Sequence, residues 1–129
     1  MTIVVGYVPT PEGNAALERA VQEARIRQGD LVVVDLDRQQ RHDPKELESR
    51  ASSLADGSVS VRAQSVEDGR DSVDAILGVA DEHDAELLVI GLRRRTPVGK
   101  LILGAQAQRI LLDAGCPVLA VKPAGTARD

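Results

Sequence analysis

The sequence predicts one α/β domain built on a parallel sheet. Short runs rich in Val, Ile and Leu alternate along the chain with segments whose apolar residues recur at helical spacing. Most of these runs are almost continuously apolar, which is typical of strands that helices cover on both faces. With 129 residues, of which 43% are hydrophobic, the chain has the size and composition of one ordinary domain.

The expected strands are apolar runs that end at turn residues or at helix-start signals. Their expected ranges are residues 3–8, 31–36, 58–63, 87–90 and 117–121. The third run alternates apolar and polar residues, so we expect it to be the least buried strand. The fifth run lies near the end of the chain, and we expect it to form an apolar edge of the sheet.

The expected helices begin after N-cap residues and early prolines. Thr10 is predicted to cap the first helix and Gly29 to end it, while Leu47 and Leu54 of the second helix are predicted to face inward. The expected ranges are residues 11–28, 44–55, 73–80 and 106–114. No linker divides the chain, so we expect one domain over residues 1–122, followed by a loose tail at 123–129.

Charge and cysteine content exclude several classes of protein. The formal net charge is −4, which argues against general binding to nucleic acid or to acidic membranes. Cys116 is the one cysteine, so no intrachain disulfide framework exists. We find no signal peptide and no apolar run of membrane-spanning length. We therefore expect a cytoplasmic protein with neither a nucleic-acid nor a membrane partner.

Residues 91–105 give the strongest indication of a ligand-binding site in the sequence. Gly91 follows the fourth strand, arginines occupy positions 93, 94 and 95, and Gly104 precedes the fourth helix. A strand, a glycine, a cationic loop and a helix start are the parts of an anion site, because N–H groups at a helix start favour negative charge. The sequence thus predicts a ligand that carries phosphate, although three arginines are also compatible with a solvated loop.

Two familiar phosphate motifs do not fit this segment. A P-loop needs glycine and a hydroxyl residue at the positions that hold Arg94 and Leu101. The dinucleotide fingerprint fails as well, because the first strand leads into Gly6-Tyr7-Val8-Pro9 and not into a glycine triplet.

The spacing of this segment resembles the nucleotide-binding motif of the universal stress protein family. That motif is Gly, two residues, Gly, nine residues, then Gly followed by Ser or Thr. Gly91 and Gly104 match its first and third glycines. The segments 75–80, 85–91 and 116–121 are also similar to the family, so the resemblance covers nearly the whole chain.

The resemblance implies a Rossmann-like, three-layer α/β/α fold whose five-stranded parallel sheet has the order 3-2-1-4-5. It implies a crevice between the loops after strands one and four that holds ATP or a related adenine nucleotide, alone or with Mg²⁺. It also implies a homodimer through strand five, at Val118, Leu119, Ala120 and Val121. The nucleotide-binding positions implied are Val8, Leu36, Ile90, Gly91, Arg93, Arg94, Gly104, Ala105 and Gln106.

Three positions depart from the family's pattern. Arg94 replaces the second glycine, Ala105 replaces the hydroxyl residue, and Val8 stands where the family often has an acid. The loss of a hydroxyl donor to phosphate removes roughly 1–3 kcal/mol. The arginines of the loop offset this loss if their side chains bind the phosphate. We expect Asp35 and Asp37, at the end of the second strand, to be solvated loop residues and not metal ligands.

Three functions are weighed on these grounds. The first is a stress-response module that holds an adenine nucleotide. The second is a nucleotide-free, dimeric interaction protein, which the three departures favour. The third, a small nucleotide hydrolase, is the weakest, because no general base, nucleophile or metal cluster appears beside the loop. We therefore expect a binding protein without enzymatic activity.

Overall fold

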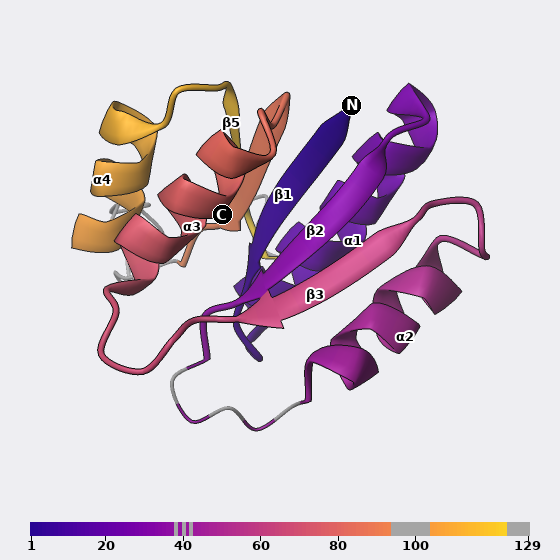
Figure 1. Ribbon diagram of the computed structural model, residues 1–129, viewed down its shortest axis with the longest axis horizontal. Helices are drawn as coiled ribbons and strands as arrows, with labels where there is room; N and C mark the ends of the chain where they lie inside the picture. The colour runs from indigo at the N-terminus through magenta and orange to yellow at the C-terminus, as the bar shows by residue number, and fades with distance from the viewer. Residues whose placement is uncertain (38, 40, 42, 94–103, 124–129) are drawn as a thin grey trace.

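The computed structural model describes residues 1–37, 39, 41, 43–93 and 104–123, and they form a parallel sheet between two layers of helices (Figure 1). The strand order is β3-β2-β1-β4-β5, so the predicted architecture and order are confirmed. The strands are β1 (Thr2–Tyr7), β2 (Asp30–Asp35), β3 (Val61–Ser65), β4 (Leu87–Gly91) and β5 (Val118–Val121). The helices are α1 (Pro11–Arg27), α2 (Pro44–Leu54), α3 (Ser72–Glu82) and α4 (Ala105–Asp113).

The sheet separates two apolar clusters, one on each face. On β1, Ile3 and Val5 point toward α1 and α2, whereas Val4 points toward α3 and α4. All three side chains are fully buried. Successive strand residues face opposite sides, so a strand buried on both faces must be apolar throughout. This explains why β1, β2 and β4 are continuous Val, Ile and Leu runs.

Backbone packs closely on backbone where α1 begins. A Cβ atom on Gly13 would collide with the Val8 carbonyl, and one on Gly91 would collide with the Glu12 carbonyl. The first turn of α1 therefore rests directly on the end of β1 and on the end of β4. Gly91 is required here because a larger residue would not fit beside the Glu12 carbonyl. Its backbone does not take the left-handed conformation, so conformational freedom is not the reason for this glycine.

Helix ends and β3 differ slightly from the predicted ranges. The ladder of β3 begins at Val61, which pairs with Leu31, and not at residue 58. Ser58 instead donates its hydroxyl to the Ala55 carbonyl at 2.6 Å and closes the turn after α2. At the end of α1, Gln28 takes the left-handed position with a φ of 57°, where Gly29 was expected to end the helix.

One predicted core position is wrong. Leu54 is 40% exposed, although helical spacing from Leu47 predicted that it faces inward. The inward stripe of α2 instead consists of Leu47, Ala51 and Ala55, which are all buried against the sheet. Small alanines let the end of α2 lie close to the sheet, and Leu54 is left on the outer side.

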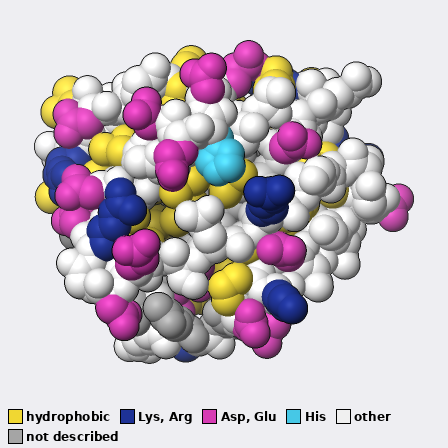
Figure 2. Space-filling model, viewed as in Figure 1, with side chains coloured by type: hydrophobic (Ala, Val, Ile, Leu, Met, Phe, Trp, Pro, Cys, Tyr) yellow, Lys and Arg dark blue, Asp and Glu magenta, His cyan; other side chains and the backbone are white. Residues whose placement is uncertain are grey.

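The exterior is predominantly polar. The face in Figure 2 carries scattered Asp and Glu side chains with single Lys and Arg side chains among them, and no continuous basic patch. Among the described residues, no helix has both the length and the apolar character needed to span a bilayer.

Candidate functional site

A crevice opens at the carboxyl ends of β1, β2 and β4, beside the start of α4. Its volume is about 590 Å³, which lies within the range of small-molecule sites. β1 is flanked by β2 on one side and β4 on the other, so the loops after these three strands meet here. In open parallel sheets ligands bind at this end of the strands, where the direction of winding reverses.

Eight of the nine predicted site positions line this one cavity. They come from four segments of the chain: the loops after β1 and β2, the end of β4 with the loop that follows it, and the N-cap and first turn of α4. These residues are Val8, Leu36, Ile90, Gly91, Arg93, Gly104, Ala105 and Gln106. The ninth, Arg94, lies outside the described residues. The cavity brings the positions together but does not by itself show what they bind.

The start of α4 presents backbone donors to the crevice. Gly104 is the N-cap, in extended conformation, and as a glycine it offers no side chain to cap the first turn of the helix. By contrast, Thr10, Asp43 and Asp71 cap the other three described helices with their side chains. The first N–H groups of any helix lack intrahelical partners. Those of α4 are therefore available to an acceptor in the crevice.

Contacts with α3 hold α4 in this position. Arg109 of α4 forms ion pairs with Asp71 at 3.2 Å and with Asp74 at 2.8 Å. Ile110, one residue further along, is buried in the core between the two helices. The backbone N–H groups of Asp74 and Val73, together with Arg109, lower the pKa of the Asp71 carboxyl. The charged form of Asp71 thus caps α3 and also anchors α4.

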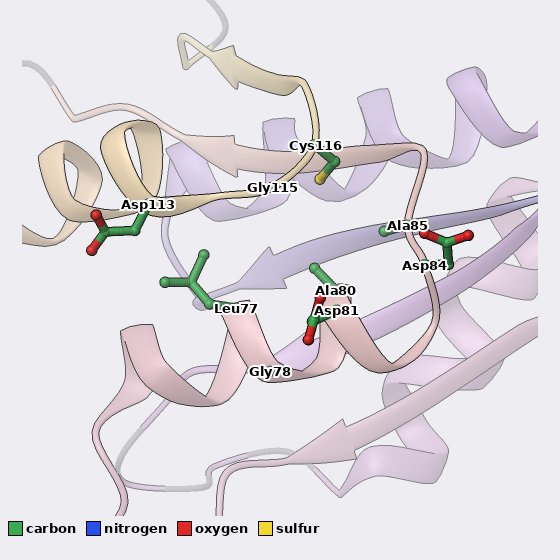
Figure 3. Close-up of a pocket in the computed structure, with 9 residues that line it drawn as sticks. All are labelled: Leu77, Gly78, Ala80, Asp81, Asp84, Ala85, Asp113, Gly115 and Cys116. Carbon is green, nitrogen blue, oxygen red and sulfur yellow. The ribbon is translucent and has the colours of Figure 1, made fainter.

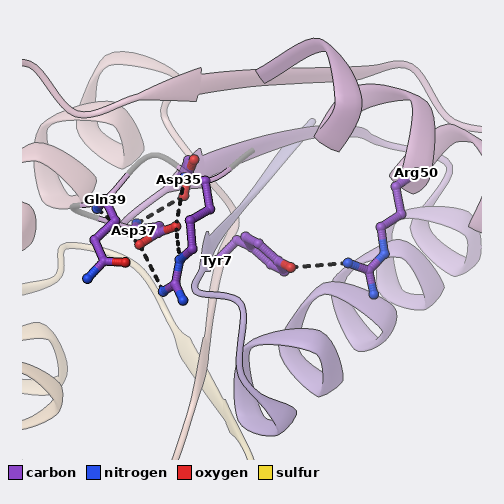
Figure 4. Close-up of polar contacts among 6 residues, drawn as sticks. Tyr7, Asp35, Asp37, Gln39 and Arg50 are labelled. Carbon is purple, nitrogen blue, oxygen red and sulfur yellow. Dashed lines mark hydrogen bonds and ion pairs between the residues drawn. The ribbon is translucent and has the colours of Figure 1, made fainter. Parts of the chain in front are cut away.

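The loop after β2 corrects the prediction that Asp35 and Asp37 are solvated. Asp35 is 2% exposed and Asp37 is 7% exposed. The Asp35 carboxylate accepts a hydrogen bond from the Asp37 N–H at 2.9 Å (Figure 4). The Asp37 carboxylate in turn accepts hydrogen bonds from the backbone N–H groups of Gln39 and Arg41, both at 3.1 Å. At Asp37, hydrogen bonds replace the solvent that burial removes, as buried charge requires.

Arg41 completes this arrangement. Its Nε donates to Oδ2 of Asp37 at 3.1 Å and its Nη2 donates to Oδ1 at 3.2 Å. The hydrogen bond from the Arg41 side chain is the main reason that the pKa of the Asp37 carboxyl falls to about 2, below its ordinary 3.8. Both residues line the crevice. The crevice therefore has an ion pair on its β2 side that the sequence analysis did not assign to the site.

A second polar cluster fixes α2 to the sheet near the same end. The Tyr7 hydroxyl donates to Asn14 Oδ1 at 3.3 Å and accepts from Arg50 Nη1 at 3.1 Å. Figure 4 shows Arg50 and the Tyr7 hydroxyl joined by this bond, and the Arg50 guanidinium lies 5.9 Å from the centre of the Tyr7 ring. Arg50 also donates to Asn14 at 2.8 Å. Tyr7 belongs to the core cluster that packs against α1 and α2, so this network joins the end of β1 to both helices.

Sequence reasoning missed some lining residues for a specific reason. Glu12 was interpreted only as a first-turn acid of α1, and Asp37 only as a loop residue. The available signal was the spacing of Asp37, Gln39 and Arg41, since an aspartate often accepts from N–H groups two residues further along a turn. The additional lining residues are Gly6, Pro9, Thr10, Glu12, Asp37, Arg41, Leu92, Ala107 and Ile110.

The crevice offers little to a metal ion. Among the described residues, no three His, Cys, Asp or Glu side chains are grouped so that they could hold one. The carboxylates that line the cavity are Glu12 and Asp37, and Asp37 is paired with Arg41. The donor set therefore does not fit a protein-bound Mg²⁺, which prefers several oxygen ligands in octahedral geometry.

Another cavity, of about 400 Å³, lies between α3 and the end of α4. Figure 3 shows the carboxylates of Asp81, Asp84 and Asp113 around it, with Cys116 at its side. Burial raises the pKa of the Cys116 thiol, so the reactive thiolate is disfavoured there. Three carboxylates would repel a phosphate, so this cavity does not compete with the crevice as an anion site.

The fold and the crevice define a class of proteins: doubly wound α/β domains with a ligand crevice at the switch point of a parallel sheet. Comparison with known proteins narrows the class. The model of the universal stress protein family matches residues 1–122. A universal stress protein of Mycolicibacterium smegmatis is 42% identical over 95% of this chain and 98% of its own length. The chain belongs to the universal stress protein family.

Two solved structures of similar proteins contain nucleotides. A universal stress protein in complex with cAMP is 25% identical, with a TM-score of 0.74, over 96% of this chain and 98% of that one. A universal stress protein of Archaeoglobus fulgidus in complex with dAMP is 27% identical, with a TM-score of 0.72, over 95% of this chain and 98% of that one. Two proteins with this fold thus bind adenine mononucleotides.

The buried Asp37 carboxylate predicts a specific pH dependence of stability. We expect Asp37→Asn to lower the free energy of unfolding by roughly 1–3 kcal/mol near neutral pH, because charge-assisted hydrogen bonds to a buried group are lost. The folded-state pKa is depressed, so this contribution is present above 3.8 and disappears as the pH falls toward about 2. Urea unfolding of both proteins across this range measures the difference.

Asp68→Asn is the matched control, since Asp68 is exposed in the loop before α3. We expect its stability to follow that of the wild type at every pH. A difference between Asp37→Asn and wild type that stays constant down to the lowest pH would contradict this account.

Proposed function

We propose that this protein binds an adenine nucleotide, ATP or a relative, in the crevice beside α4 and acts as a non-catalytic module of the stress response. The observation that carries the proposal is the start of α4, which lacks a side-chain cap and opens into a cavity that Arg93 also lines. A helix start of this kind attracts phosphate through its N–H groups and its dipole. The adenine nucleotides bound by two similar proteins support this choice of ligand.

Each predicted position has a part in this proposal. The N–H groups of Ala105 and Gln106 would bind phosphate, and Gly104 leaves room for its oxygens. Arg93 and Arg94 would add charge-assisted hydrogen bonds. The base would lie against apolar residues at the ends of β1, β2 and β4, and Gly91 would keep that end of the crevice open. The apolar positions are Val8, Leu36 and Ile90.

Mg²⁺ does not enter the proposal as a protein-bound ion. The carboxylates of the crevice are too few to hold it, and Val8 provides no ligand where the family often has an acid. The lining residues also do not include a nucleophile paired with a base, as a hydrolytic site requires. We therefore propose binding without turnover, in the cytoplasm, as the expected role.

A nucleotide-free, dimeric interaction protein is the second candidate. Ala105 lacks the hydroxyl that would donate to phosphate, and Val8 lacks a carboxylate for a ribose hydroxyl. Each missing hydrogen bond makes the free energy of nucleotide binding less favourable by roughly 0.5–3 kcal/mol. Mass spectrometry of small molecules released from denatured, purified protein separates the two candidates.

We expect calorimetric titration to show ATP binding that the double substitution Arg93→Ala with Arg94→Ala weakens roughly tenfold or more, because charge-assisted hydrogen bonds to phosphate are lost. The matched control is Arg25→Ala with Arg62→Ala, which removes two exposed arginines that do not line the crevice. Equal affinity of all three proteins would refute a role for the arginine loop. Absence of ATP, ADP and AMP binding to the wild type would favour the nucleotide-free alternative.

We also propose that the protein is a homodimer through β5. Val118, Leu119, Ala120 and Val121 form the edge of the sheet, next to β4 alone, and each is only half-buried. An apolar edge strand with unpaired backbone groups favours pairing with a second chain.

Light scattering tests this interface. We expect Leu119→Lys and Ala120→Lys to produce folded monomers, since either lysine places a charge within the apolar edge. Leu112→Lys is the control, because Leu112 of α4 is 83% exposed and is not part of β5. If both β5 variants remain dimeric while circular dichroism shows a native spectrum, the interface lies elsewhere.

A further inference from the structure

The Asp37–Arg41 pair holds a guanidinium at a fixed place on the crevice wall. The Asp37 side chain is 4% exposed, whereas the Arg41 side chain is 57% exposed. Asp37 is itself fixed by backbone N–H groups of its own loop, at 3.1 Å from Gln39 and 3.1 Å from Arg41 (Figure 4). The buried carboxylate therefore acts as an anchor, and the exposed guanidinium is the part that a ligand can reach.

The anchoring bonds occupy one edge of the guanidinium and leave another for a ligand. Nε and Nη2 of Arg41 both donate to Asp37, which uses the edge that these two nitrogens share. A guanidinium has five N–H groups in one plane, so Nη1 and the second hydrogen of Nη2 form a further fork at its end. A ligand with two neighbouring acceptor atoms can bind this fork without breaking the bonds to Asp37.

The charge of the pair indicates which end of a nucleotide it meets. The Asp37 carboxylate neutralises Arg41, so the pair offers directed donors with little net attraction for an anion. Positive potential is concentrated instead at the start of α4 and at Arg93, on the β4 side of the cavity. β2 and β4 lie on opposite sides of β1, so the pair and the phosphate end are separated across the crevice.

The surroundings of the pair fit a nucleoside. Leu36, which is half-buried, lines the cavity beside Asp37 and provides an apolar surface for a base. Purine ring nitrogens and ribose oxygens are neutral acceptors, which suits a directed donor whose charge is already compensated. Val8, between the two sides, contributes no carboxylate that could bind the ribose in its place.

We propose that Arg41, positioned by Asp37, is a specificity-determining residue that holds the nucleoside end of the nucleotide by hydrogen bonds to its base or ribose. This inference rests on the proposed nucleotide-binding function and deepens it. It assigns recognition of the nucleoside to the loop after β2 and recognition of phosphate to the start of α4 and its arginines. Asp37 is a positioning residue in this scheme, since it acts on the ligand through Arg41.

Calorimetry with AMP and ATP, and competition of adenosine against AMP, test the assignment. We expect Arg41→Ala to weaken all three ligands by the same factor, roughly tenfold, because the lost hydrogen bonds go to the part that they share. Arg41→Lys should not restore affinity, since an ammonium cannot form two parallel forks. Asp37→Asn should weaken binding of all three ligands by one common factor that is smaller than the factor for Arg41→Ala. Arg62 is an exposed residue of β3 outside the crevice, so Arg62→Ala should leave the affinity for each ligand unchanged.

The outcomes separate this inference from the function on which it rests. If the wild type binds no nucleotide, both are overturned. If the wild type binds and Arg41→Ala binds equally well, only the role of Arg41 is overturned. A loss for AMP and ATP without a loss for adenosine would make Arg41 a phosphate ligand and would also overturn it, as would failure of adenosine to compete at millimolar concentration. Full rescue by Arg41→Lys would show that charge alone is needed and would overturn the role of the guanidinium as a directed donor.

Discussion

The crevice depends on the close contact of the first turn of α1 with the ends of β1 and β4. Gly13, in this turn, leaves room for the Val8 carbonyl after β1, and Gly91, at the end of β4, leaves room for the Glu12 carbonyl of the turn. Any larger residue would force backbone apart, because the colliding atoms cannot move as a flexible side chain can. The two glycines thus let the first turn of α1 lie against the ends of β1 and β4, where residues of all three elements or of the loops beside them line the crevice.

Two kinds of polar group lie on opposite sides of the crevice. On the β4 side, an uncapped helix start and Arg93 provide positive potential. On the β2 side, Arg41 is neutralised by a buried carboxylate and provides direction without net charge. A nucleotide has the same asymmetry, with a charged phosphate end and a neutral nucleoside end. In the proposed complex, Val8 and Ala105 would each remove one polar partner of the nucleotide, and the arginines on both sides would compensate for this loss.

Strand order and the crevice positions were predictable because they follow from spacing and family resemblance. Gly91 and Gly104 come together with Val8 and Leu36 once the order 3-2-1-4-5 is known. The spacing of Asp37 and Gln39 was a local signal for a hydrogen-bonded turn, but it could not show that the carboxylate is buried, because acids after a strand are usually solvated. The ion pair with Arg41, four residues away, compensates that burial. The exposure of Leu54 was missed for a similar reason, because helical spacing cannot show that alanines fill the inner face of α2.

The most direct test of the account is a two-dimensional amide NMR titration of the isotope-labelled protein with AMP. If the crevice binds the nucleotide, the amide signals of Gly91, Ala105 and Gln106 shift in a saturable manner, as do those of Leu36 and Asp37 on the β2 side. The amides of Gly115 and Cys116, beside the acidic cavity, stay unchanged. Saturable shifts confined to Gly115 and Cys116, or no shift at millimolar AMP, would contradict the account.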